Sequence, residues 1–111
     1  MNLIKLINDR KTDFVDLCVG HKVEKLYAFG SSITNRFDEE KSDVDVLVEL
    51  NLIDPLEYGE TLLALWDNLE IFFERKVDLL TEDSIHNPYL RKSIEATKTL
   101  IYDRQREKIF V

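Results

Sequence analysis

Apolar and polar positions alternate along this chain in segments that predict strands. Residues 44–50 show the clearest pattern, because apolar side chains recur at every second position from Val44 to Leu50, the period of two that a strand requires. Three shorter apolar segments predict further strands at residues 25–29, 76–80 and 99–102. The sequence therefore predicts four strands.

The segments between the strands carry apolar residues at helical spacing or are polar. The first helix is expected over residues 3–19, where Gly20 suits its C-terminal end. Pro55 fits the first turn of a strongly apolar helix that reaches Phe73. The other expected segments are a short helix over 31–36, a polar loop over 37–42, a short helix before Pro88, a helix over 89–96, and a charged tail or last helical turn over 104–111.

Helices and strands thus alternate from one end of the chain to the other. Such an order predicts an α/β or α+β fold, in which helices cover the faces of a sheet. The 111 residues are expected to form one domain, spanning residues 1–111.

Charge narrows the classes of function. The chain has 22 acidic and 15 basic residues and a formal net charge of −7, which disfavours non-specific binding to nucleic acid, so we expect no direct contact with DNA. A nucleotide substrate is still allowed, because a divalent cation can supply positive charge. The longest apolar runs have roughly six residues, far short of a membrane span, so no membrane association is expected.

Cysteine usage bears on the compartment. Cys18 is the single cysteine, which rules out an internal disulfide. No signal peptide is recognisable in the sequence. We therefore expect a reducing, cytoplasmic location.

A Gly-Ser pair follows the strand predicted at residues 25–29. Gly30 would let the backbone approach a phosphate closely, because it has no Cβ. Ser31 would offer a hydroxyl and an N–H group at the start of a short helix, where the helix dipole favours anions. Alone, the pair more often marks an ordinary turn with a helix cap.

Two aspartates stand at the start of the strand predicted at residues 44–50. Asp43 and Asp45 are two positions apart, so their carboxylates are expected on the same face. Like charges held close together favour a cation between them, and hard oxygen ligands suit Mg²⁺. The alternative is a solvated turn at Asp43 and an exposed strand face at Asp45.

Asp78 interrupts the next apolar strand, in the sequence Val-Asp-Leu-Leu. If this strand lies beside the strand of Asp45, three carboxylates can share two divalent cations. Asp78 could also accept the proton of an attacking hydroxyl. The alternative is a surface aspartate on an edge strand.

These residues together resemble the motif of the minimal nucleotidyltransferases of the DNA polymerase β superfamily. The family motif is a strand, Gly-Ser, a spacer, Asp-x-Asp, and a third Asp on a later strand. Gly30-Ser31, an eleven-residue spacer, Asp43-x-Asp45 and Asp78 reproduce it. The similarity covers residues 26–80 by motif and nearly the whole chain by the order of its elements.

The resemblance implies a polymerase β-like fold, a small mixed sheet flanked by helices. It also implies Mg²⁺-dependent transfer of a nucleoside monophosphate, AMP from ATP, to a hydroxyl with release of pyrophosphate. Asp43 and Asp45 would bind two Mg²⁺ ions, and Asp78 would complete the site of the ion that activates the acceptor.

The resemblance also implies residues that hold the nucleotide. Gly30 and Ser31 would hold the β- and γ-phosphates of the nucleoside triphosphate. Arg36, on the short helix after the turn, would reach the triphosphate, or is an ordinary surface arginine.

Small members of this family are commonly paired with an all-helical HEPN-type RNase toxin. The enzyme adenylylates a tyrosine of the toxin and acts as the antitoxin of a type VII-like toxin–antitoxin module. The resemblance implies such a partner here, and acceptor recognition borrowed from another protein or from a second copy of the chain. The alternative is a non-catalytic antitoxin, or a binding subunit of the same fold, that neutralises its partner by contact.

Overall fold

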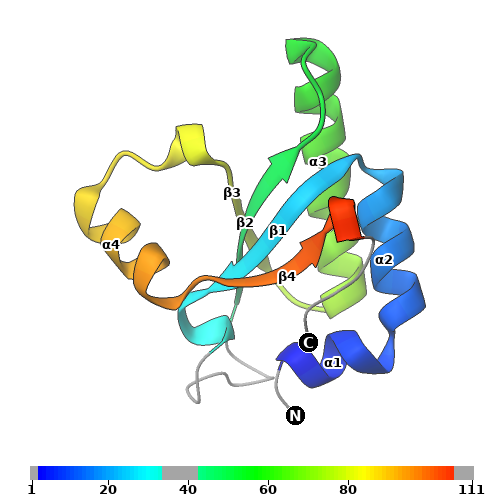
Figure 1. Ribbon diagram of the computed structural model, residues 1–111, viewed down its shortest axis with the longest axis horizontal. Coiled ribbons are helices and arrows are strands. Elements are labelled where there is room, and N and C mark those ends of the chain that lie inside the picture. Colours follow the sequence, from blue (N-terminus) through cyan, green and yellow to red (C-terminus); the bar gives the residue numbers. More distant parts are fainter. Residues whose placement is uncertain (1–2, 34–42, 107–111) are drawn as a thin grey trace.

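The computed structural model describes residues 3–33 and 43–106, apart from the side chains of Ser31 and Arg106, and it contains a four-stranded sheet (Figure 1). The strands lie in the order β3-β2-β1-β4, where β2 is parallel to β3 and β1 is antiparallel to β2 and β4. Their bounds are β1 Val23–Phe29, β2 Val44–Leu50, β3 Val77–Leu80 and β4 Thr99–Asp103.

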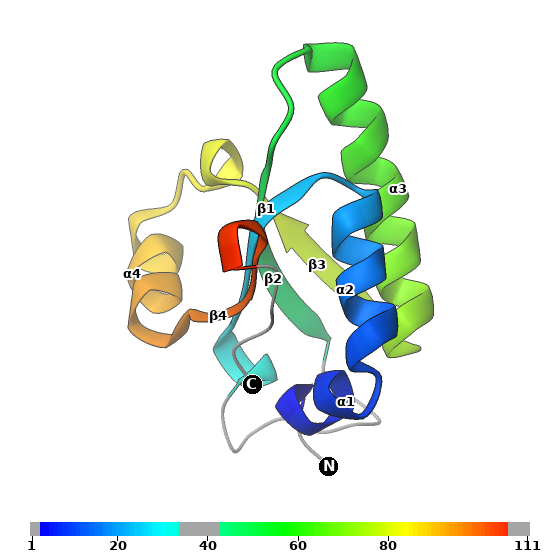
Figure 2. The same ribbon diagram turned by 45° about the vertical axis from the view of Figure 1, so that its right-hand side comes forward.

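Helices cover both faces of this sheet. Figure 2 shows α2 (Lys11–Gly20) and α3 (Pro55–Phe73) on one side and α4 (Pro88–Thr97) on the other. Helix α1 (Leu3–Asp9) joins the first group, because its residues Leu3 and Ile7 are buried in the same core. The mixed sheet flanked by helices confirms the expected α+β class. Among the described residues, no helix combines the length and apolar character needed to cross a membrane.

The two faces of β2 enter two different cores. Val44, Val46 and Val48 belong to the main core under α1, α2 and α3. Leu47 belongs to a smaller core with Phe29, Ile85 and Ile94 under α4. Neighbouring residues of a strand point in opposite directions, so Asp45 faces the α4 side.

The single helix predicted over residues 3–19 is wrong, because the chain breaks at Arg10 into α1 and α2. Arg10 has a non-helical backbone, and its guanidinium donates to the carbonyl oxygen of Phe72 at 3.0 Å and lies 4.4 Å from the centre of the Phe72 ring. At this break, Arg10 therefore connects the N-terminal helices to the end of α3. The buried residues Leu3, Ile7, Phe14 and Cys18 also fit the period of one unbroken helix, so periodicity does not indicate the break.

The other elements agree with the sequence to within a few residues. The strand predicted at 44–50 is confirmed. Capping explains where two helices begin: Asp54 accepts from the N–H of Glu57 at the start of α3, and Asn87 accepts from the N–H groups of Tyr89 and Leu90 at the start of α4. Pro88 therefore lies inside α4.

Three short 3₁₀ turns complete the chain: η1 Gly30–Ser32, η2 Glu82–Ser84 and η3 Arg104–Arg106. The helix predicted over 31–36 is only the η1 turn as far as the structure describes it. The loop predicted over 37–42 and the end of the predicted tail, residues 107–111, lie outside the described residues.

Strand β3 stands at the edge of the sheet, and side chains of α3 cap its main chain at Val77. The indole N–H of Trp66 donates to the carbonyl oxygen of Val77 at 2.6 Å, and the N–H of Val77 donates to the carboxylate of Glu70 at 3.0 Å. These two bonds fix β3 against α3.

Candidate active site

Two aspartates meet where β2 and β3 run side by side. Asp45 is in register with Asp78 in this parallel pair. Side chains in register on adjacent strands point to the same face, so both carboxylates lie on the α4 side of the sheet. The structure therefore brings together two of the three predicted acidic residues.

The environment of Asp45 disfavours its negative charge. Burial is the largest cause, followed by the charge of Asp78, a hydrogen bond with the Asp78 side chain and the charge of Asp43, and together they raise the pKa of Asp45 from 3.8 to about 6. Asp45 is half-buried, so water screens these charges only in part. A cation bound here would remove the repulsion.

Asp43 immediately precedes β2 and is partly exposed. Its side chain is 43% exposed, and its carboxylate lies 4.0 Å from the Nζ of Lys76. Within the described part of the chain, no three His, Cys, Asp or Glu side chains are grouped closely enough to hold a metal ion. The structure thus shows an adjacent Asp45–Asp78 pair with Asp43 at its margin.

The Gly-Ser turn lies directly beside Asp45. Phe29, the last residue of β1, is in register with Asp45, and Gly30 follows with a φ of +65°, which only glycine adopts readily. A Cβ at Gly30 would lie 3.1 Å from the Oδ2 of Asp45. Both the backbone angle and the close carboxylate therefore favour glycine here.

Two other predicted nucleotide-binding residues are described in part or not at all. The main chain of Ser31 lies in the η1 turn beside Gly30, but its side chain is not among the described atoms. Arg36 lies outside the described residues.

A cavity of about 370 Å³ opens at the carboxylate pair. Gly30, Asp45 and Asp78 line its polar part. Its remaining lining is mainly apolar and includes Trp66 of α3 and Leu90 of α4. Its volume is within the range of about 300–1,000 Å³ that small-molecule sites occupy.

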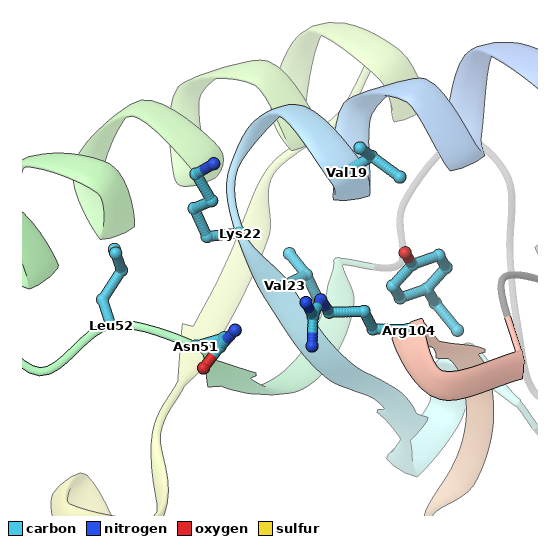
Figure 3. A pocket seen from close by; sticks show the side chains of 7 residues that line it. Val19, Lys22, Val23, Asn51, Leu52 and Arg104 are labelled. Carbon is cyan, nitrogen blue, oxygen red and sulfur yellow. The ribbon is translucent and has the colours of Figure 1, made fainter.

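A second cavity, of about 390 Å³, lies at the other end of the sheet (Figure 3). Its lining includes Val23, Asn51 and Arg104 and no acidic residue. Val23 and Phe29 stand at opposite ends of β1, roughly 20 Å apart at the usual rise of a strand. The second cavity is therefore separate from the carboxylates.

The sequence matches the family described as nucleotidyltransferase domain over residues 5–101. The chain belongs to this family. Two proteins of Methanocaldococcus jannaschii, each named a putative protein adenylyltransferase, are 42% and 43% identical to this nucleotidyltransferase over 82 residues, which cover 74% of this chain and 78% of each relative.

Solved structures share the fold of this nucleotidyltransferase. One is described as a putative minimal nucleotidyltransferase; it is 25% identical, has a TM-score of 0.59, and the match covers 89% of this chain and 95% of that one. Another is described as a crystal structure of a mutant of the toxin–antitoxin MntA-HpeT, with 17% identity, a TM-score of 0.59, and coverage of 86% of this chain and 75% of that one.

Two polar residues of the nucleotidyltransferase site were missed by the sequence analysis. Ser32 is 1% exposed; its hydroxyl accepts from the N–H of Asp45 at 2.7 Å and donates to the carbonyl oxygen of Asp43 at 3.4 Å. Thr97 accepts from the N–H of Gly30 at 2.9 Å across 67 positions of sequence. No local pattern in the sequence indicates either contact.

Proposed function

We propose that this nucleotidyltransferase transfers AMP from ATP to a hydroxyl group of a protein and releases pyrophosphate. The observation that carries the proposal is the placement of Asp45 and Asp78 near the Gly30 turn, where all three residues line a cavity of about 370 Å³. The relatives named protein adenylyltransferases support both AMP as the transferred group and a protein as the acceptor class.

The carboxylates fit divalent metal ions. The raised pKa of Asp45 reflects burial together with the negative charges of Asp78 and Asp43, and hard carboxylate oxygens are the ligands that Mg²⁺ prefers. Mg²⁺ commonly takes one or two carboxylates, with substrate phosphates and water as its other ligands. Such a site does not require three protein ligands grouped in advance.

We assign two Mg²⁺ ions to Asp43, Asp45 and Asp78, with Asp78 serving the ion nearest the acceptor. When bound, the ions would neutralise the triphosphate and lower the pKa of the acceptor hydroxyl. In the reaction the acceptor oxygen bonds to the α-phosphorus, the bond between that phosphorus and the bridging oxygen breaks, and pyrophosphate leaves. Asp78 takes the proton of the hydroxyl.

The triphosphate would lie over the turn that follows β1. Gly30 lets the backbone approach it, and Ser31 supplies an N–H group and a hydroxyl to the β- and γ-phosphates. Arg36 is the proposed cationic contact to the same phosphates.

The proposed acceptor is a tyrosine of a HEPN-type RNase toxin, so that this chain acts as the antitoxin of a type VII-like module in the cytoplasm. This part of the proposal comes from the family resemblance. The toxin–antitoxin complex among the solved structures shares the fold with this chain, and that likeness extends to the fold alone.

The proposal is tested with the purified chain, its candidate toxin partner, ATP and Mg²⁺. We expect the intact mass of the partner to increase by AMP and pyrophosphate to be released. Asp45→Asn and Asp78→Asn should each abolish the transfer, because each removes a carboxylate of the proposed metal site. Asp16→Asn, which removes an exposed carboxylate from α2, is the matched control and should keep the wild-type rate.

Two other outcomes would contradict the proposal. Transfer at the wild-type rate by Asp45→Asn would contradict the assignment of Asp45 as a metal ligand. An inhibited but unmodified partner would instead identify a binding subunit that neutralises its partner by contact.

A further inference from the structure

The β1–β2 pairing ends before it reaches Asp43. Phe29 and Asp45 form its last residue pair, after which β1 turns away at Gly30. On the other side of β2, the N–H of Val44 donates to the carbonyl oxygen of Lys76, which precedes β3. Because main-chain groups alternate in direction along a strand, those of Asp43 and Asp45 point toward the side that β1 has left.

The side chain of Ser32 hydrogen-bonds to the main chain of β2 and of Asp43 where the β1–β2 pairing ends. Its hydroxyl receives the N–H of Asp45 at 2.7 Å and donates to the carbonyl oxygen of Asp43 at 3.4 Å. One side chain thereby connects the N–H of Asp45, in the last residue pair of β1 and β2, to the carbonyl oxygen of Asp43, which lies beyond that pairing. Ser32 is 1% exposed, so water has little access to the position of its hydroxyl.

We propose that Ser32 is a positioning residue that holds the main chain of Asp43 and Asp45 in the geometry needed for divalent cation binding. The inference rests on the proposed function, because it concerns the same carboxylates. Ser32 touches neither cation nor substrate in this role; it acts through the backbone of the two ligands. Groups that hydrogen-bond to the ligating side chains themselves typically contribute about 10–100-fold to metal affinity, and we expect an effect of similar size from Ser32.

The test measures cation binding as well as catalysis. Mn²⁺ binding is measured by electron paramagnetic resonance in the presence of a non-hydrolysable ATP analogue, and the Mg²⁺ midpoint of the transfer reaction is measured in parallel. Ser32→Ala should weaken Mn²⁺ binding about 10-fold or more and shift the Mg²⁺ midpoint in the same direction. Saturating Mg²⁺ should restore much of the lost rate.

Ser84 provides a matched control. Its hydroxyl likewise bridges two main-chain groups, accepting from the N–H of Thr81 at 3.1 Å and donating to the carbonyl oxygen of Thr81 at 2.8 Å, but it lies in η2 outside the carboxylate cavity. Ser84→Ala should leave Mn²⁺ affinity within twofold of wild type. A general effect of losing a serine bridge would appear in both variants.

If Ser32→Ala does not fold, the isosteric pair Ser32→Thr and Ser32→Val decides, because only the first retains the hydroxyl. The threonine variant should bind Mn²⁺ several-fold more tightly than the valine variant. Equal Mn²⁺ affinity in that pair, or wild-type affinity in a folded Ser32→Ala, would overturn the inference. Asp45→Asn separates this failure from failure of the metal site, because it loses Mn²⁺ binding only if the site itself is correct.

Discussion

Asp45 of β2 lies in register with Asp78 of β3, and burial together with this neighbouring carboxylate raises the pKa of Asp45 to about 6. The two residues come from strands separated in sequence by the whole of α3. Their contact is a property of the parallel pairing, which places two negative charges where a packed sheet face would otherwise carry apolar side chains.

The contribution of Asp45 to the stability of the metal-free protein should fall as pH rises from 3.8 through about 6. The folded-state pKa of Asp45 lies above its ordinary value of 3.8, so the folded protein binds the proton more tightly than the unfolded chain. The stabilising contribution is complete below pH 3.8 and is lost as pH rises through about 6. Asp45→Asn should therefore stabilise the protein more at pH 8 than at pH 4.

The measurement is urea unfolding in the presence of EDTA at both pH values. The exposed Asp16→Asn serves as the control and should show a smaller pH-dependent difference from wild type. An equal increase in unfolding free energy for Asp45→Asn at pH 4 and pH 8 would show that the charge of Asp45 does not destabilise the folded protein.

Alanine at two glycines should have opposite effects on stability. Gly30→Ala forces a Cβ into a left-handed backbone, 3.1 Å from the Asp45 carboxylate, and should cost more than about 1 kcal/mol and reduce transfer. Gly59→Ala, in the interior of α3 with open space around it, should instead stabilise by roughly 0.5–1 kcal/mol. Thermal unfolding of both variants checks the pair, and a neutral Gly30→Ala would contradict it.

Thr97 should affect nucleotide binding through the Gly30 turn. Thr97→Val keeps the shape of the side chain but leaves the N–H of Gly30 without its acceptor, which we expect to raise the KM for ATP several-fold and destabilise the protein by about 1 kcal/mol. Thr97→Ser keeps the hydroxyl and should stay near wild type in both. Steady-state kinetics at saturating Mg²⁺ measure the effect, and similar behaviour of the two variants would refute the role.

Arg10 should stabilise the junction between the N-terminal helices and α3. Its bond to the carbonyl oxygen of Phe72 and its contact with the Phe72 ring are both lost in Arg10→Ala, for an expected cost of roughly 1–2 kcal/mol. Lys11→Ala removes a neighbouring exposed cation and should change unfolding free energy by less than about 0.5 kcal/mol. Chemical denaturation measures the unfolding free energy of both variants. Equally small changes for Arg10→Ala and Lys11→Ala would show that Arg10 does not stabilise this junction.

Much of the fold could be predicted because local patterns and burial coincide. The alternation at Val44–Leu50 reflects a strand that buries every second residue, Val44, Val46 and Val48, in the main core. Pro55 and Pro88 mark helices whose starts are capped by the preceding residue. The break at Arg10 could not be predicted in the same way, since its cause is a contact with Phe72, 62 positions away.

The site shows the same division. Asp45 and Asp78 stand out because acidic residues in apolar strands are locally unusual, and Gly30 and Asp43 stand out at the end of one strand and just before another. The supporting hydroxyls of Ser32 and Thr97 do not, since serine and threonine are common near turns and helix ends, and their partners become neighbours only after the sheet has formed.

The capped main chain of Val77 has a consequence for solubility. A strand at the margin of a sheet can recruit a strand from another molecule through its free N–H and C=O groups. At Val77 both groups are already bonded, to Glu70 and Trp66. At Val77, the strand that carries Asp78 therefore offers no free main-chain groups with which a strand of another molecule could pair.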